Sequence, residues 1–128
     1  MQSQKIRRKA REGMLSWTSK IERQFGDELR KKFSDVQVQV WVNDKCVDFY
    51  LPSIAIYLQF DGVYWHGLDR PIERIAEGKS SRDVQIHRKW VADREQDVWF
   101  QQQGLCLVRI TDVEYKRMGT KVLERLVT

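Results

Sequence analysis

Residues 36–61 read VQVQVWVNDKCVDFYLPSIAIYLQFD, and this segment predicts consecutive β-strands. Over residues 36–42, valine alternates with polar side chains except at Trp41, which is the two-residue period of a half-buried strand. The Asn-Asp-Lys triplet at 43–45 is typical of a turn, and residues 46–51 form the returning strand. The sequence therefore predicts a β-hairpin in this part of the chain.

A third strand is predicted over residues 54–60, after a break at Pro52 and before an Asp61-Gly62 turn. Side-chain alternation places Gln59 and Asp61 on one face of this strand. If the second and third strands are neighbours, Asp48 approaches both residues at one end of the sheet. Such a polar cluster suits Mg²⁺, which binds oxygen ligands and takes few of them from protein. The alternative is that Asp48 ends a solvated strand face and that Asp61 only shapes the turn.

Helical patterns lie on both sides of the strands. A first helix is expected from about Ser16 to Phe33, where apolar residues recur every four positions. Further along, the sequence predicts a loop at 63–67 and an irregular or weakly helical stretch at 68–79. A long helix is expected at 81–103, ended by Gly104. A strand at 105–110 and a last helix opened by a Thr111–Glu114 capping box follow. The order α-β-β-β-α-β-α predicts an α/β fold with a mixed central β-sheet flanked by helices, because the strand after the long helix needs a crossover connection.

The positive charge is concentrated near the N-terminus. The chain has 128 residues and a formal net charge of +5, and its length suits one domain. Residues 1–33 hold ten basic and four acidic residues, a net charge of +6. We expect residues 1–15 to be a basic N-terminal arm or the remnant of a linker, and residues 16–128 to be a single domain.

The densest basic cluster consists of Lys5, Arg7, Arg8, Lys9 and Arg11. This cluster suits contact with nucleic-acid phosphates, because each neutralised phosphate releases counterions. Charge alone is equally typical of a soluble, frayed helix. The two interpretations stay open on the composition.

Composition also excludes some classes of protein. No apolar run is long enough to cross a bilayer, and none near the N-terminus is typical of a signal peptide, so we expect an intracellular protein. Cys46 and Cys106 have no CxxC spacing and no nearby histidine partner. We therefore expect two reduced, packed cysteines rather than a zinc site or a disulfide framework.

His66 lies in an aromatic loop after the third strand. A loop histidine beside a strand-end carboxylate can take a proton from water, because its pKa is near neutral. By itself, a histidine between Trp65 and Gly67 is more typical of a packed or surface residue.

Asp93 and Asp97 lie four residues apart, on one face of the long helix. This acidic pair either points at the same site as Asp48 or only pairs with Lys89 and Arg94 on its own helix. The helical spacing leaves both interpretations open.

Three segments carry a resemblance to a known family. They are Val47-Asp48-Phe49-Tyr50-Leu51-Pro52, then Ile54-Ala55-Ile56, then Asp61-Gly62-Val63-Tyr64-Trp65-His66-Gly67. Together they resemble the core of the very-short-patch-repair endonuclease superfamily, a branch of the PD-(D/E)XK nucleases. The helix, glycine and strand after residue 93 are similar to the ending of the same group. Within it, the chain is most similar to phage homing endonucleases named for an E-D-x-H-D residue set, from about Ser16 to the C-terminus.

The resemblance implies a role for three residues. Asp48 matches the family's metal-binding aspartate, and His66 matches a histidine that acts as general base or positions water. Glu22 on the first helix matches the family's N-terminal glutamate, which is expected to orient the water shell of the metal. Without the resemblance, Glu22 is better explained by a capping box with Ser19. The implied cofactor is Mg²⁺ or Mn²⁺.

The fourth acidic position of the family is open in this sequence. Asp61 is the first choice and would be a second metal ligand, ahead of Asp97 and Asp93. The ordinary PD-(D/E)XK motif places an acid near Gln59 and a lysine two residues later, but here Gln59 is neutral and the lysine is absent. A histidine in place of the lysine fits the repair-type branch, whereas Gln59 is a weaker metal ligand than a carboxylate.

The resemblance implies a metal-dependent DNA endonuclease, with residues 16–128 as the catalytic domain of a homing endonuclease. We expect double-stranded DNA as partner, no membrane, a cytoplasmic location in a bacterial or phage-infected cell, and a dimer where both strands are cut. Trp65 is a candidate to contact DNA, because such enzymes can wedge aromatic side chains into a base stack. For Trp41, packing is the better interpretation. The alternative function is a catalytically inactive nucleic-acid-binding module of the same fold, which Gln59 favours.

Overall fold

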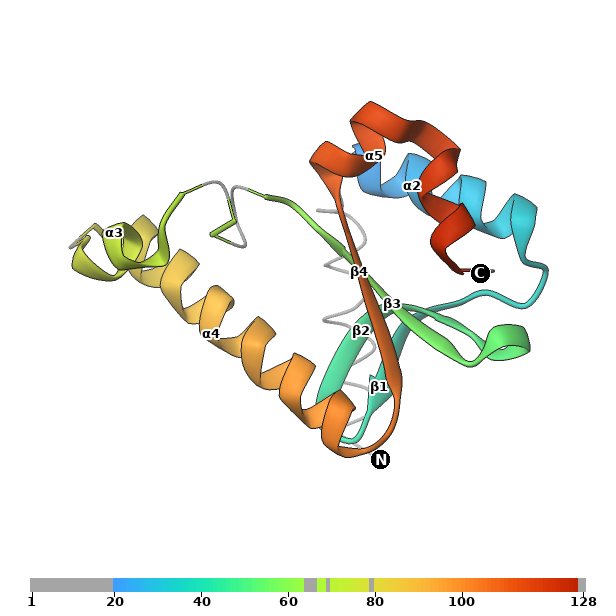
Figure 1. Cartoon of the computed structure of the whole chain (residues 1–128), viewed down its shortest axis with the longest axis horizontal. Coiled ribbons are helices and arrows are strands. Elements are labelled where there is room, and N and C mark those ends of the chain that lie inside the picture. Colours follow the sequence, from blue (N-terminus) through green and yellow to red (C-terminus); the bar gives the residue numbers. More distant parts are fainter. Residues whose placement is uncertain (1–19, 64–66, 69, 79, 127–128) are drawn as a thin grey trace, which may run out of the picture.

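The structure is a computed structural model, and it describes residues 20–63, 67–68, 70–78 and 80–126. A four-stranded sheet lies at its centre, in the order β1-β2-β3-β4 (Figure 1). The strands are β1 (Gln37–Val42), β2 (Lys45–Leu51), β3 (Ile56–Asp61) and β4 (Cys106–Thr111). The first two pairings are antiparallel and the β3–β4 pairing is parallel. The predicted α/β class with a mixed central sheet is confirmed.

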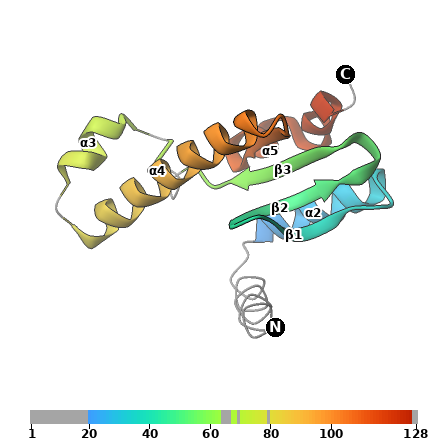
Figure 2. The ribbon, with the colours of Figure 1, turned by 90° about the horizontal axis from the view of Figure 1, so that it is seen from below.

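Helices cover both faces of this sheet (Figures 1 and 2). One face carries α2 (Lys20–Lys32), α5 (Asp112–Met118) and the 3₁₀ helix η2 (Gly119–Leu126). The other face carries α4 (Ser81–Gln102), which is the crossover between β3 and β4. The short helix α3 (Ile72–Glu77) packs on the N-terminal half of α4, away from the sheet. Among the described helices, none is both long enough and apolar enough to cross a membrane.

The main core is built from aromatic rings between α2, α5 and the sheet. Phe25 of α2 contacts Phe49 of β2 and Phe60 of β3, with ring centroids 5.7 and 4.8 Å apart. Tyr115 of α5 packs edge-on against Phe25 at 5.3 Å. On the opposite face, Tyr57 contacts Phe100 of α4 at 5.2 Å. These contacts fix which side chains of β3 face α2 and which face α4.

Some element boundaries differ from the sequence prediction. The third strand begins at Ile56 rather than residue 54, because Pro52–Ile54 forms the 3₁₀ helix η1 and Ala55 has a left-handed backbone with φ of 52°. The last helix divides at Gly119, where φ is +59°. The stretch expected to be irregular or weakly helical contains α3.

The predicted helix ends are confirmed where the structure describes them. Gly104 has φ of +70° and follows the C-cap of α4, which is the backbone conformation that favours glycine after a helix. Thr111 and Glu114 form a reciprocal capping box at the start of α5. Cys46 and Cys106 form no disulfide within the described residues, and Cys106 is exposed on the edge strand β4, so its predicted packing is wrong.

Candidate active site

The strands β2 and β3 part at Asp48 and Gln59. Backbone pairing between them ends at Phe49 opposite Leu58. Beyond that pair, Gln59 Oε1 accepts the Asp48 N–H at 2.9 Å, and Asp48 Oδ2 accepts the Phe60 N–H at 2.8 Å. Two side chains thus replace the backbone bonds that would continue the ladder. The predicted approach of Asp48 to Gln59 is confirmed.

Glu22 and Asp48 line the same pocket, although they come from α2 and β2. This pocket has a volume of about 280 Å³ and lies between α2 and the β1–β2 hairpin. Its walls consist of Glu22, Arg23, Gly26, Asp27, Arg30, Val38, Gln39, Asp48 and Phe49. The helix can approach the sheet closely because Gly26 has no side chain: a Cβ there would lie 3.4 Å from the Phe49 ring. The pocket therefore combines carboxylates with arginines.

The carboxyl group of Asp48 titrates near neutrality. Burial is the largest cause that raises its pKa, to about 7 from 3.8, and the negative charges of Glu22 and Asp61 raise it further. The hydrogen bond from the Phe60 N–H and the positive charge of Lys89 act in the opposite direction. Negative charge thus accumulates around Asp48, and a bound cation would relieve it.

Gln39 lies opposite Asp48 in the β1–β2 hairpin. Its neighbours pair regularly, Val38 with Phe49 and Val40 with Val47, but Gln39 has a left-handed backbone with φ of 51°. This conformation is strained for a residue with a side chain. Gln39 is only 6% exposed, and its Oε1 accepts a hydrogen bond from Cys46 Sγ at 3.6 Å.

Asp61 is bound by an arginine from β4. It is 1% exposed, and Arg109 Nη1 lies 3.2 and 3.1 Å from its two carboxylate oxygens. The parallel register places Arg109 opposite Gln59, two residues before the partner of Asp61. This ion pair competes with any cation for the Asp61 oxygens, so the role of Asp61 as a metal ligand stays a prediction.

The same guanidinium connects the sheet to α4. Arg109 Nε donates to Asp97 at 2.6 Å, and Nη2 donates to the Asp93 carbonyl at 3.1 Å and to Gln96 Oε1 at 2.6 Å. Gln96 in turn donates to the carbonyl of Cys46 on β2 at 3.0 Å. Burial lowers the pKa of Arg109, but the surrounding carboxylates outweigh it and raise that pKa above its ordinary value. The guanidinium therefore stays charged.

Asp93 and Asp97 also make the ion pairs within α4 that were one of their two predicted roles. Lys89 Nζ lies 3.3 Å from Asp93 Oδ1, and Arg94 Nε lies 3.2 Å from Asp97 Oδ2. Their carboxylates gather around Arg109, at 3.9 and 2.6 Å. A metal-binding role for either residue has to compete with these cations.

Several predicted site residues lie outside the described residues. They are His66, Trp65 and the basic cluster Lys5, Arg7, Arg8, Lys9 and Arg11. Within the described ranges, no three His, Cys, Asp or Glu side chains form a group that could hold a metal. Glu22 and Asp48 alone fit a cation such as Mg²⁺, which commonly binds through one or two carboxylates and keeps several waters. Trp41 is 39% exposed, which contradicts its expected packing.

The sequence alone did not identify Arg109, Gln96 or Gln39 as parts of this region. A signal existed for Arg109, since an arginine in a strand of apolar and small residues needs a buried acidic partner. Gln96 and Gln39 carried no such signal, because neutral amides are ordinary on helices and strands. Comparison of the chain with known protein families, curated proteins and solved structures found no match.

Proposed function

We propose that this protein is a metal-dependent DNA endonuclease, with residues 16–128 as its catalytic domain. The observation that carries the proposal is the meeting of Glu22 and Asp48 in one pocket, where each adds to the negative potential at the other. Both residues match functional positions in the resemblance to very-short-patch-repair and homing endonucleases.

The proposed cofactor is Mg²⁺ or Mn²⁺, held by Asp48 and, if its pairing with Arg109 yields, by Asp61. When bound, the cation supplies charge neutralisation at the phosphate and at the leaving oxygen. Asp48 is suited to this role because its strand position is fixed on both sides, through its own N–H and through its Oδ2. Glu22 is the residue proposed to hold a water molecule by its carboxylate.

His66 is the proposed general base, which takes a proton from the attacking water. The described residues Val63 and Gly67 bracket its segment, and a Cβ at Gly67 would lie 3.2 Å from Ile75 of α3 and from Ile86 of α4. The proposed product carries a 5′-phosphate, as the resemblance implies. Cleavage of both strands then needs two copies of the domain or two successive nicks. We also propose a cytoplasmic location in a bacterial or phage-infected cell.

A second candidate function is a catalytically inactive nucleic-acid-binding module. Two observations favour it. The neutral side chain of Gln59 accepts a hydrogen bond from the Asp48 N–H, and Asp61 is bound by Arg109. In such a module, Asp48 has only the structural task of joining β2 to β3. The two candidates differ in whether a cation and Asp48 are needed for strand cleavage.

The deciding experiment is incubation of supercoiled plasmid with the full chain, in Mg²⁺ or in EDTA, beside Asp48→Ala. Nicked or linear product that requires both Mg²⁺ and Asp48 supports the endonuclease. Binding of the plasmid without any product, at high protein concentration, favours the inactive module. A matched control is Asp44→Ala, which removes an exposed carboxylate from the β1–β2 turn and leaves the pocket intact.

A further inference from the structure

The wall of the Asp48 pocket that α2 provides carries two arginines. Arg23 and Arg30 are seven residues apart, which is about two helical turns, so they lie on one face of α2. Gly26 lies between them on that face, and a Cβ at Gly26 would be 3.9 Å from Arg30 Nη1. The two guanidinium groups therefore border the pocket in which Glu22 and Asp48 meet.

Arg23 differs from Arg30 in its surroundings. Arg30 forms an ion pair with Asp27 at 3.4 Å, although both side chains are largely exposed. Arg23 is also exposed, and within the described part of the chain it has no ion pair. Arg23 lines the same pocket as Glu22 and Asp48, so a ligand that reaches these two carboxylates passes within reach of its guanidinium.

Without a positively charged group at its border, the pocket is electrostatically unfavourable for DNA. Glu22, Asp27 and Asp48 repel a polyanion. A phosphate can approach only where local positive charge offsets this repulsion. Arginine is well suited, because its fork of N–H groups binds two phosphate oxygens at once.

We propose that Arg23 binds a backbone phosphate of the DNA, adjacent to the phosphate that faces Glu22 and Asp48. This inference rests on the proposed function, and it names the protein group that holds the substrate strand over the site. Such a contact positions the strand and adds affinity, but it does not read sequence. Arg30 borders the same path of the DNA strand. A phosphate contact by Arg30 adds less affinity, because Arg30 first gives up its ion pair with Asp27.

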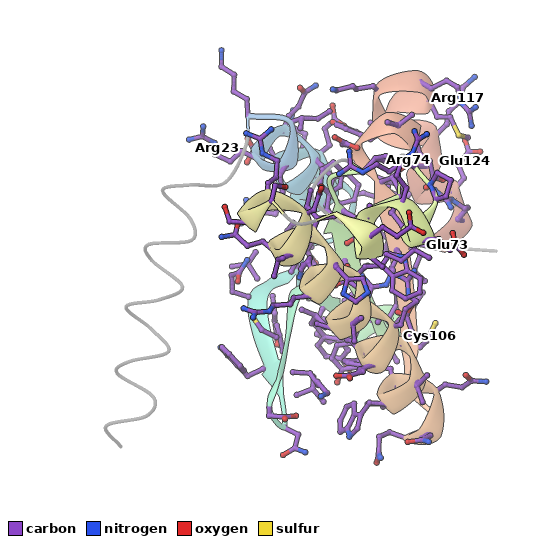
Figure 3. All side chains as sticks on the ribbon, turned by 90° about the vertical axis from the view of Figure 1, so that its left-hand side faces the viewer. Arg23, Glu73, Arg74, Cys106, Arg117 and Glu124 are labelled. Atoms are coloured by element: carbon purple, nitrogen blue, oxygen red, sulfur yellow. The ribbon has the colours of Figure 1, made fainter. Side chains whose placement is uncertain are left out.

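The test measures binding of the full chain to a labelled duplex at several NaCl concentrations, with Ca²⁺ in place of Mg²⁺ to keep the DNA intact. The variants are Arg23→Ala, Arg23→Lys and Arg117→Ala. Figure 3 shows Arg23 on α2 and Arg117 on α5 on opposite sides of this view, and Arg117 does not line the pocket, so it is a matched exposed control. Plasmid cleavage in Mg²⁺ is measured in parallel for the wild type.

We expect Arg23→Ala to weaken binding about tenfold at about 0.1 M salt, as loss of a charged hydrogen bond does. The slope of log affinity against log salt should fall by about 0.9, the value for one phosphate contact. Arg23→Lys should keep the slope, and Arg117→Ala should change neither quantity.

Other outcomes separate this inference from the endonuclease itself. Cleavage by the wild type together with unchanged binding by Arg23→Ala overturns the phosphate contact and leaves the nuclease standing. Loss of binding by Arg23→Ala in a protein that never cleaves supports the contact and overturns the nuclease. Equal losses for Arg23→Ala and Arg117→Ala mean diffuse attraction and overturn the contact. A wild type that binds no DNA overturns both.

Discussion

Asp48 and Gln59 each use a side chain to complete the backbone of the opposite strand. Gln59 Oε1 accepts the N–H of Asp48 at 2.9 Å, and Asp48 Oδ2 accepts the N–H that follows Gln59, on Phe60, at 2.8 Å. The pair closes the gap where β2 and β3 part. It also explains how a carboxylate at a strand position can be both half-buried and held in one orientation.

Replacement of Asp48 by asparagine separates its structural task from its chemical one. Asparagine keeps an oxygen that can accept the Phe60 N–H, so we expect Asp48→Asn to fold and to bind DNA. Without a negative charge to hold the cation, plasmid cleavage in Mg²⁺ should fall by at least about 10²-fold. Cleavage at the wild-type rate by this variant, with a normal melting temperature, would remove Asp48 from the proposed site.

The raised pKa of Asp48 predicts a pH dependence of stability. In the folded protein Asp48 keeps its proton up to a pKa of about 7, whereas the unfolded chain releases it near 3.8. The folded state therefore binds more protons between about pH 4 and pH 7, and the free energy of unfolding falls as pH rises through this window. The free energy of unfolding of Asp48→Asn should not fall in this way, because asparagine does not ionise.

Melting temperatures of the wild type and Asp48→Asn, measured from pH 4 to pH 8, check this prediction. We expect similar values at pH 4 and a more stable variant at pH 8. Addition of Mg²⁺ at pH 8 should stabilise the wild type and leave the variant unchanged, since only the wild type binds the cation. Parallel curves for the two proteins across the whole range would contradict the raised pKa.

Two substitutions at Gln59 distinguish its structural and chemical roles. Gln59→Leu leaves the half-buried N–H of Asp48 without its acceptor, which should cost about 1–3 kcal/mol of unfolding free energy in urea titrations. Gln59→Glu keeps an acceptor and adds a second carboxylate beside Asp48. We expect tighter Mg²⁺ binding by Gln59→Glu in calorimetry, and an affinity no higher than that of the wild type would argue against a cation at this gap.

Much of this fold follows from local patterns in the sequence. The alternation over residues 36–51 gave a hairpin, and the Thr111–Glu114 pattern gave the start of α5, because both depend on neighbours close in sequence. The predicted boundaries are wrong where the backbone conformation of a single residue ends or divides an element. Ala55 and Gly119 take positive φ values that interrupt an otherwise continuous apolar pattern.

The candidate site was only partly predictable, for a physical reason. The meeting of Asp48 with Gln59 followed from strand alternation, and its meeting with Glu22 followed from the family resemblance alone. Arg109 joins Asp61 to Asp97 across three elements, and such pairings depend on the parallel β3–β4 register and on the path of α4. Sequence spacing carries no information on that path.

Arg109 forms ion pairs with three acidic residues, Asp61, Asp93 and Asp97. Removal of its charge takes the guanidinium from Asp61 and Asp93, which are 1% and 3% exposed, although Lys89 stays 3.3 Å from Asp93. We expect Arg109→Met to lower the free energy of unfolding by about 3–5 kcal/mol in urea titrations, because removal of one partner from a buried ion pair is costly.

Two controls accompany this measurement. Arg117→Met removes an exposed arginine and should change stability by less than about 0.5 kcal/mol. The double variant Arg109→Met/Asp61→Asn should recover part of the loss, since it also removes the buried charge of Asp61. A loss below about 1 kcal/mol for Arg109→Met would mean that water or other groups solvate these carboxylates.

The left-handed backbone of Gln39 has a consequence for association between molecules. β1 is the edge strand of the sheet, and no charged residue lies between Gln37 and Val42 to discourage another strand from adding to it. The turn of the backbone at Gln39 interrupts the flat row of N–H and C=O groups that such a strand needs. Gln39→Val, which favours an extended backbone, should restore that row and lower the concentration at which light scattering detects aggregates. The strained backbone of Gln39 should thus also oppose the edge-to-edge association of sheets from two molecules.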